Sequence, residues 1–267
     1  MIRVSALFRY PIKSCRGAPL EEAALDQRGI VGDRQLMLVD PEGSFLTQRD
    51  LPRMALIVPS LDGDLLTVRA PGADELRVRC TRGGPRVDVT IWRDLCVAVD
   101  QSQEASDWFR AFLGVPCRLV GMADEHVRRV DAKYARRSDD QTAFTDGYPL
   151  LLMSEASLED LNRRLPAPLP MNRFRPSVVV RGCDPYAEDG WREIRIGSLG
   201  FDVVKPCERC IITTIDQDAS EFGLEPLRTL ATYRRFPSGG VMFGQNLVHH
   251  GPGTLRVGDP VEVVEPG

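Results

Sequence analysis

The sequence predicts a mainly β protein with a few helices (α+β), built from an N-terminal β-barrel-like domain and a second β-rich domain. Three observations lead to this fold class. Short runs of Val, Ile and Leu alternate with Gly, Pro and Asp through the first hundred residues, as expected of strands joined by turns. Only short stretches have helical periodicity. A polar stretch at residues 123–141 divides the chain.

Apolar runs bounded by turn residues predict five strands in the first half, at residues 35–39, 44–47, 65–69, 76–80 and 87–92. The first two runs flank an Asp-Pro-Glu-Gly sequence, which has Pro and Gly where a tight turn favours them. We therefore expect a hairpin over residues 35–47.

One helix is predicted at residues 103–113, where four large apolar side chains recur at three- and four-residue steps and Gly114 follows as a stop. Beyond it, residues 123–141 are dense in Arg and Asp, which indicates a linker or mobile loop. We place the domain boundary near residue 121, giving domains over residues 1–121 and 122–267.

The second half begins with an apolar run at residues 148–153, followed by an amphipathic helix that Ser154 caps and that extends to Asn162. Further strands are predicted at residues 177–181, 193–196, 201–204 and 211–215. A short helix with Pro226 near its first turn follows. A pair of strands joined at residues 258–259 closes the chain.

The composition argues against several classes of protein. The net charge of −4 gives no basic excess of the kind typical of nucleic-acid-binding proteins, so we expect no nucleic-acid partner. Seven scattered cysteines, an odd number, favour a reducing compartment over a disulfide framework. The first residues contain no signal peptide or membrane anchor. The expected location is the cytoplasm, without a membrane partner.

Residues 205–210, Lys-Pro-Cys-Glu-Arg-Cys, are the most informative segment, because two thiols stand beside two cations. The β-branched run that follows predicts a strand, with the thiols at its entrance. Neighbouring Lys or Arg lowers the pKa of a cysteine and favours the thiolate, which is a nucleophile and a soft-metal ligand.

Four interpretations of Cys207 and Cys210 remain open on the residues alone. Both thiols could simply be buried near a strand. A zinc site would need four ligands, and the chain has no second CxxC. A thioredoxin-like dithiol precedes a helix, whereas this pair precedes β-branched residues. The fourth interpretation makes one thiolate a ligand to a redox-active metal that an organic cofactor holds.

The fourth interpretation requires anion-binding residues elsewhere, and three segments offer them. The first contains Lys13 and Ser14 in a turn, and the second places Arg34 after Asp33. The third, residues 172–177, has two arginines flanking a phenylalanine. Arginine's planar fork suits a phosphate or the face of a heterocycle. A solvated turn and an ordinary surface ion pair are the alternatives for the first two segments.

Together these segments resemble the MOSC family, the molybdenum-cofactor sulfurase C-terminal domain, preceded by its N-terminal β-barrel domain. The similarity spans nearly the whole chain and rests on the motifs YPIKSC at 10–15, GDR at 32–34, LMSEASL at 152–158, FRP at 174–176, YAED at 186–189, CERC at 207–210 and FGQN at 243–246. Within the family, the chain is similar to the mitochondrial amidoxime-reducing component and its bacterial counterparts.

The resemblance implies a molybdenum cofactor, with molybdopterin, and assigns residues to it. Cys210, the second cysteine of CxxC, matches the molybdenum ligand and catalytic position, and Cys207 is its neighbour in the cofactor site. The other positions that it implies for cofactor binding or the surrounding cleft are Lys13, Ser14, Arg34, Thr145, Asp146, Arg175, Pro176, Ser177 and Asn246. Ser177 replaces an Asn that is common in relatives, which shortens one polar contact.

The implied activity is the two-electron reduction of N-hydroxylated compounds, such as amidoximes and N-hydroxylated nucleobases, with loss of oxygen as water. Because no flavin or iron–sulfur motif is visible, a separate electron-donor reductase is the expected partner, beside a small-molecule substrate. Two alternatives stay open, namely a sulfur carrier that forms a persulfide and a protein that stores or delivers molybdenum cofactor.

Overall fold

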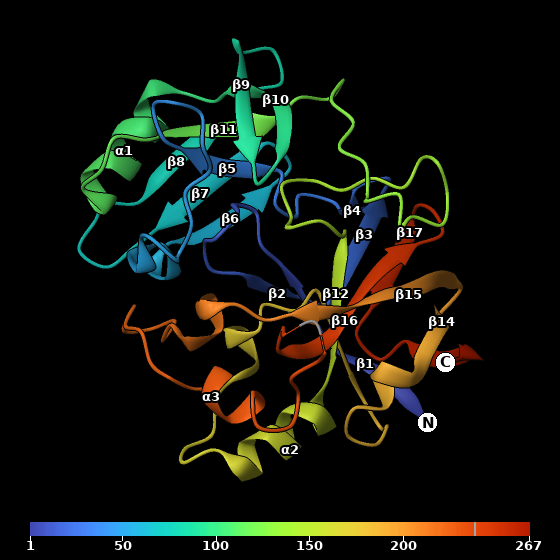
Figure 1. Ribbon diagram of the computed structural model, residues 1–267. Helices are drawn as coiled ribbons and strands as arrows, with labels where there is room; N and C mark the ends of the chain where they lie inside the picture. The colour runs from blue at the N-terminus through green and yellow to red at the C-terminus, as the bar shows by residue number, and fades with distance from the viewer. Residues whose placement is uncertain (238) are drawn as a thin grey trace.

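The computed structural model describes residues 1–237 and 239–267, and its centre is a closed seven-stranded β-barrel (Figure 1). Around the barrel the strand order is β13-β12-β16-β15-β14-β18-β1, and β1 pairs back with β13. Only β12 and β13 are parallel neighbours. The strands are β1 (Ile2–Arg9), β12 (Leu150–Ser154), β13 (Val178–Arg181), β14 (Trp191–Ile196), β15 (Leu199–Glu208), β16 (Met242–His249) and β18 (Pro260–Pro266).

The first strand of the chain closes the barrel of the second half. In β1, Arg3 pairs with Arg181 and Leu7 with Val178, and the other edge of β1 pairs with β18. Because alternate residues of a strand face the same side, Leu7 and its counterparts on the other strands point inward and are buried. β2 (Ala18–Leu20) extends this sheet beyond β1.

Smaller sheets make up the rest of the structure, at the upper left of Figure 1 and beside the barrel. They are β5 (Leu36–Val39), β11 (Arg118–Met122), β10 (Asp94–Asp100) and β9 (Arg86–Ile91) in one sheet; β6 (Val58–Asp62), β7 (Leu65–Arg69) and β8 (Leu76–Arg79) in a second; and β17 (Gly253–Arg256), β3 (Glu22–Asp26) and β4 (Gly29–Ile30) in a third. The predicted mainly β class is thus confirmed.

α1 (Gln103–Leu113) begins and ends where predicted, whereas α2 (Glu155–Arg164) begins at its predicted capping serine but extends beyond its predicted end at Asn162. The Ser102 side chain accepts from the backbone N–H of Ala105 at the start of α1, and Gly114 ends it in the left-handed conformation. Ser154 caps α2 in the same way through Ser157. α3 (Leu227–Leu230) follows directly after Pro226.

Several predicted elements differ from the structure. Residues 44–47 form only isolated bridges, from Ser44 to Thr90 and from Phe45 to Val39, so the expected hairpin has one strand and one irregular arm. The strands that flank residues 258–259 exist, but they do not pair with each other, because β17 joins β3 and β18 joins β14 and β1. The strands that were not predicted are β1, β2, β3, β4, β6, β10, β11 and β16.

The connecting segment at residues 123–141 has no helix or named strand among these described residues, yet it is anchored to the first half. The guanidinium of Arg128 is buried and donates to the carbonyls of Ala143 and Thr145 and to the Asp94 carboxylate. The domain boundary near residue 121 stays a prediction. Across residues 1–237 and 239–267, no helix has the length and apolar character needed to span a membrane.

Candidate functional site

The two thiols lie at the exit of a strand, which corrects the prediction that they stand at a strand's entrance. β15 continues to Glu208, so it includes Cys207, and Cys210 then precedes a 3-10 turn at Ile211–Thr214. The Thr213 hydroxyl donates to the carbonyl of Cys210 at 2.9 Å, and Thr214 does the same to Ile211. These local bonds compete with sheet formation, which is why the β-branched run is not a strand.

Different arginines contact the two sulfur atoms. Arg49 Nη2 lies 3.3 Å from Cys210 Sγ, and Arg209 Nη1 lies 3.0 Å from Cys207 Sγ. Both cysteines are free and half-buried. Arg49 comes from the first half of the chain, so the two halves meet at the Cys210 sulfur.

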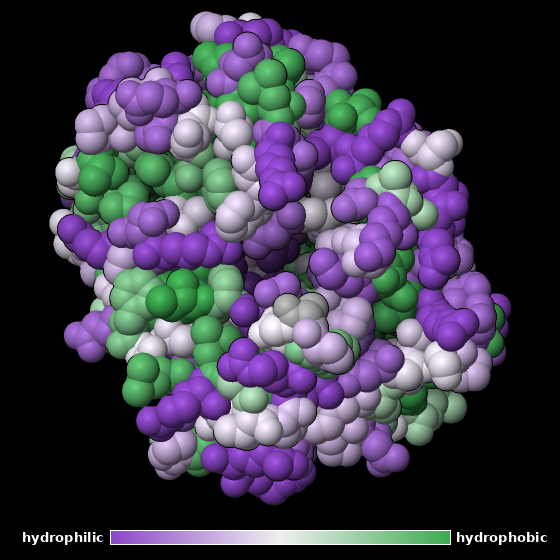
Figure 2. Space-filling view, viewed as in Figure 1, coloured by the Kyte–Doolittle hydropathy of each residue, from purple (hydrophilic) through white to green (hydrophobic). Residues whose placement is uncertain are grey.

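The thiols open into a polar cleft between the two halves, which appears in Figure 2 as a hollow surrounded by hydrophilic side chains. Ten of the eleven candidate residues line it: Lys13, Ser14, Arg34, Thr145, Asp146, Arg175, Ser177, Cys207, Cys210 and Asn246. Pro176 does not. Its carbonyl instead accepts a hydrogen bond from the Tyr10 hydroxyl, so Pro176 supports the wall from behind.

One wall of the cleft is built around Tyr10. The guanidinium groups of Arg34 and Arg175 lie 4.0 Å and 4.4 Å from the centroid of its ring. Asp33 accepts from the backbone N–H of Tyr10 and pairs with Arg34 at 2.6 Å. Arg34 also donates to the Arg175 carbonyl. Burial raises the pKa of Asp33, and the adjacent Arg34 opposes that rise. These contacts fix both guanidinium groups.

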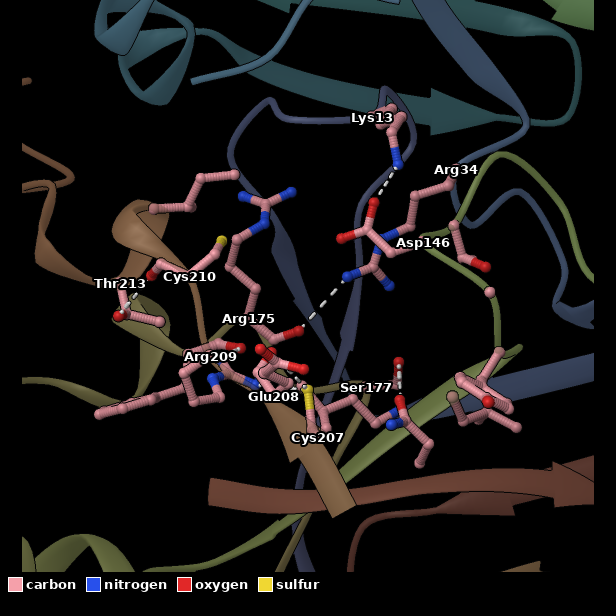
Figure 3. Close-up of a pocket in the computed structure, with 18 of the residues that line it drawn as sticks. Lys13, Arg34, Asp146, Arg175, Ser177, Cys207, Glu208, Arg209, Cys210 and Thr213 are labelled. Carbon is pink, nitrogen blue, oxygen red and sulfur yellow. Dashed lines mark hydrogen bonds and ion pairs between the residues drawn. The ribbon is translucent and has the colours of Figure 1, made fainter. Parts of the chain in front are cut away.

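Lys13 and Asp146 form the second polar contact of this wall, with 2.6 Å between Nζ and Oδ1 (Figure 3). The lysine is buried, which lowers its pKa, whereas the aspartate side chain is 64% exposed to the cleft. Desolvation opposes ionisation of Asp146, but Lys13, Arg49 and Trp92 together lower the pKa of its carboxyl group. Asp146 is therefore an anion at neutral pH.

Backbone strain is concentrated at this cleft. Six described residues other than glycine have positive φ, and Ser14 (65°), Arg34 (46°) and Arg175 (56°) are three of them. Such a conformation costs about 1–2 kcal/mol for a residue with a side chain. Strain of this kind is typical of functional sites, where the surrounding structure holds a side chain in a required position.

The cleft has a strong excess of positive charge. Seven basic side chains line it against two carboxylates, those of Asp146 and Glu208. The basic residues are Lys13, Arg34, Arg49, Arg173, Arg175, Lys205 and Arg209. In the part of the chain that the structure describes, Arg49, Arg175, Lys205 and Arg209 have no carboxylate at ion-pair distance. The buried Nε of Arg209 also has no hydrogen-bond partner there.

Arg49 is the main residue that the sequence did not identify. It follows the predicted hairpin within a polar Thr-Gln-Arg-Asp stretch, and nothing in its spacing relates it to a cysteine 161 residues later. Lys205, Arg209 and Arg173 were visible as neighbours of the motifs. Only the folded chain shows that they face the same cleft.

This donor set suits an anionic group that also carries a thiophilic metal. Uncompensated, partly desolvated guanidinium groups bind phosphate through charge-assisted hydrogen bonds. Cys210 supplies one accessible sulfur, as the fourth interpretation requires. A closed zinc site needs more ligands than this, and the described residues contain no cluster of three or more His, Cys, Asp or Glu side chains suited to a metal.

The chain matches two protein families in succession. Residues 1–116 match the MOSC N-terminal beta barrel domain, and residues 139–262 match the MOSC domain. Together the two matches account for both halves of the structure and for both walls of the cleft.

Its curated relatives include amidoxime-reducing components from mammals. Mitochondrial amidoxime-reducing component 1 of mouse is 37% identical over 97% of this chain and 81% of the relative. The human protein of the same name is 37% identical over 97% and 82%. Mitochondrial amidoxime reducing component 2 of human is 36% identical over 97% and 82%.

Proposed function

Because the chain belongs to the family of two-domain MOSC proteins that includes the mitochondrial amidoxime-reducing components, we propose that it is a molybdenum-cofactor-dependent reductase of N-hydroxylated compounds. The family relationship supports an N-reductive oxidoreductase. The cofactor, the substrate class and the residue roles are our proposal. One observation carries it: the Cys210 sulfur faces a cleft that Lys13, Arg34 and Arg175 also line (Figure 3).

In this proposal the two walls hold different parts of the cofactor. Cys210 is the protein's ligand to molybdenum, and Lys13, Ser14, Arg34 and Arg175 bind the pterin and its phosphate. Thr145, Ser177 and Asn246 add polar contacts from the barrel side. When bound, the molybdenum cofactor would supply the two-electron redox chemistry of the reaction.

The protein's own residues bind and orient the substrate. An amidoxime takes up two electrons and two protons and leaves as an amidine and water. Its N–H groups match the Asp146 carboxylate, which is ionised and exposed to the cleft. Lys13 holds that carboxylate in place. Cys207 contacts Arg209. In this proposal it lies near the metal ligand Cys210 but does not itself bind the metal.

The electrons come from a separate flavin or iron–sulfur reductase that docks transiently near the cleft. We retain the cytoplasm as the proposed location of this chain, although its relatives are named as mitochondrial proteins.

Metal analysis together with turnover tests the proposed function. The protein, purified from a host that makes molybdenum cofactor, should contain about one molybdenum per chain. With a chemical electron donor it should convert benzamidoxime to benzamidine. A preparation that contains molybdenum but reduces no N-hydroxylated compound would support cofactor storage or delivery instead.

A sulfur carrier is the second candidate, and Cys207 is the observation that favours it. Its sulfur shares the cleft with Cys210 but has its own guanidinium partner, Arg209. Mass spectrometry of the intact chain would detect a persulfide as one added sulfur after incubation with a small-molecule persulfide, which transfers its outer sulfur to the cysteine and leaves as a thiol. A persulfide on a chain without molybdenum would support this alternative.

A further inference from the structure

Trp92 occupies a conformation that its side chain disfavours. It is the first residue of the two-residue turn between β9 and β10, with φ at 55°. Hairpin turns favour Gly, Asn or Asp where φ is positive, because a large side chain is strained there. The ring is also 49% exposed, so burial in a core does not explain the choice of tryptophan.

Three contacts hold the exposed ring at the edge of the cleft. The guanidinium of Arg49 lies 4.7 Å from its centroid, and the edge of Phe45 packs against it at 5.0 Å. The indole N–H donates to Asp146 Oδ1 at 3.3 Å. Arg49 and Asp146 both line the cleft. The ring is therefore rigidly placed although it is open to solvent.

Arg49 connects this ring to the proposed reaction centre. One end of its guanidinium lies over the indole, and Nη2 contacts Cys210 Sγ at 3.3 Å. Trp92 itself lies outside the residues that line the cleft, so a molecule bound at Cys210 that extends outward beyond Arg49 and Asp146 meets its aromatic ring. Aromatic surfaces bind planar conjugated groups by stacking, and saturated groups of similar size gain less.

We propose that Trp92 is a specificity-determining residue, and that its exposed ring binds the planar aryl or heteroaryl part of the substrate. This inference rests on the proposed function, since it places the N-hydroxylated group of the same molecule toward Asp146 and Cys210. Trp92 takes no part in the chemistry. It raises the affinity for planar substrates.

The test compares Trp92→Leu with Trp92→Phe in the cofactor-loaded protein. Titration calorimetry measures the Kd of benzamidine, a planar product, and of acetamidine, which has no ring. Trp92→Leu should raise the Kd of benzamidine about fivefold and change the Kd of acetamidine less than twofold. Phenylalanine keeps an aromatic face and should remain within about twofold of the wild-type protein for both ligands.

Kinetics provide the second measurement. The KM of benzamidoxime should rise in parallel with the Kd of benzamidine in Trp92→Leu, with kcat unchanged within about twofold. Ser220→Leu is the matched control, because Ser220 also has positive φ (57°), whereas its backbone N–H bonds to the Asp216 carbonyl and not to a residue that lines the cleft. It should leave the ratio of the two KM values, for benzamidoxime and acetamidoxime, unchanged.

The outcomes separate this inference from the proposed function. If the wild-type protein reduces neither amidoxime, the proposed function fails. In another outcome, the wild-type protein reduces both amidoximes, while Trp92→Leu changes the Kd values of benzamidine and acetamidine by the same factor or lowers kcat without raising KM. In that case the role of Trp92 is to hold Arg49 in position, and it does not bind the substrate. That result would overturn the specificity role and leave the proposed reductase activity standing.

Discussion

The two walls of the cleft are built in different ways. The wall from the first half presents Lys13 and Arg34, each paired with a carboxylate, and Arg34 is also held by a network around Tyr10. The wall from the second half presents two thiols at the end of β15, beside Arg209, which has no carboxylate at ion-pair distance among the described residues. Protein contacts already hold the side chains of the first wall in place. In the second wall, the Nε of Arg209 has no hydrogen-bond partner among the described residues. Neither half alone contains the proposed site.

The largest expected effect distinguishes the two thiols of the second wall. Cys210→Ser removes the proposed metal ligand, so molybdenum content and amidoxime turnover should both fall by at least about 100-fold. Cys207→Ser should retain molybdenum and lose less than about tenfold in kcat. Elemental analysis and steady-state kinetics measure both variants. Equal loss of molybdenum in the two variants would contradict this prediction, because it would mean that both thiols contribute equally to metal binding.

A second prediction concerns the preformed network of the first wall. Arg34→Ala leaves the Asp33 carboxylate buried without its partner, at 3% exposure, and should reduce the free energy of unfolding by about 3 kcal/mol. Arg86→Ala breaks an exposed pair with Glu125 and should cost less than about 1 kcal/mol. Urea denaturation measures both. Similar losses would show that the Asp33 network is not rigidly formed.

The smallest expected effect is the pH dependence of the Lys13–Asp146 pair. The folded-state pKa of Asp146 is lowered, so this group stabilises the protein above its unfolded pKa of about 3.9, and the stabilisation is lost as the pH falls toward the folded value. Because Asp146 is exposed, the effect should be about 1 kcal/mol.

Urea midpoints of the wild-type protein and Asp146→Asn, measured at pH 6 and at pH 3, test this third prediction. The wild-type protein should be the more stable at pH 6, and the difference should shrink at pH 3. A difference that stays constant between the two pH values would exclude ionisation of Asp146 as its source.

The sequence predicted local structure well where a short pattern determines it. Ser102 and Gly114 delimit α1 because capping depends only on neighbouring residues. The run at residues 211–215 was predicted wrongly, because hydroxyls of Thr213 and Thr214 bond to nearby carbonyls and override the strand preference of β-branched residues.

The candidate site was predictable only in part. Family motifs indicated ten residues that do line the cleft, but Arg49 and Trp92 were not among them. Their relation to Cys210 and Asp146 depends on how the irregular arm after β5 and the β9–β10 turn approach the barrel. Contacts between distant segments leave no spacing signal in a single sequence.

The pairing of β1 with β13 and β18 has a consequence for how the chain folds during synthesis. β1 is made well before residues 178–181 and 260–261, so the edges of β1 that these residues cover stay unpaired until they have been made. Such long-range pairing slows folding. Nascent chains that stall between these points should therefore depend strongly on chaperones that shield unpaired strands.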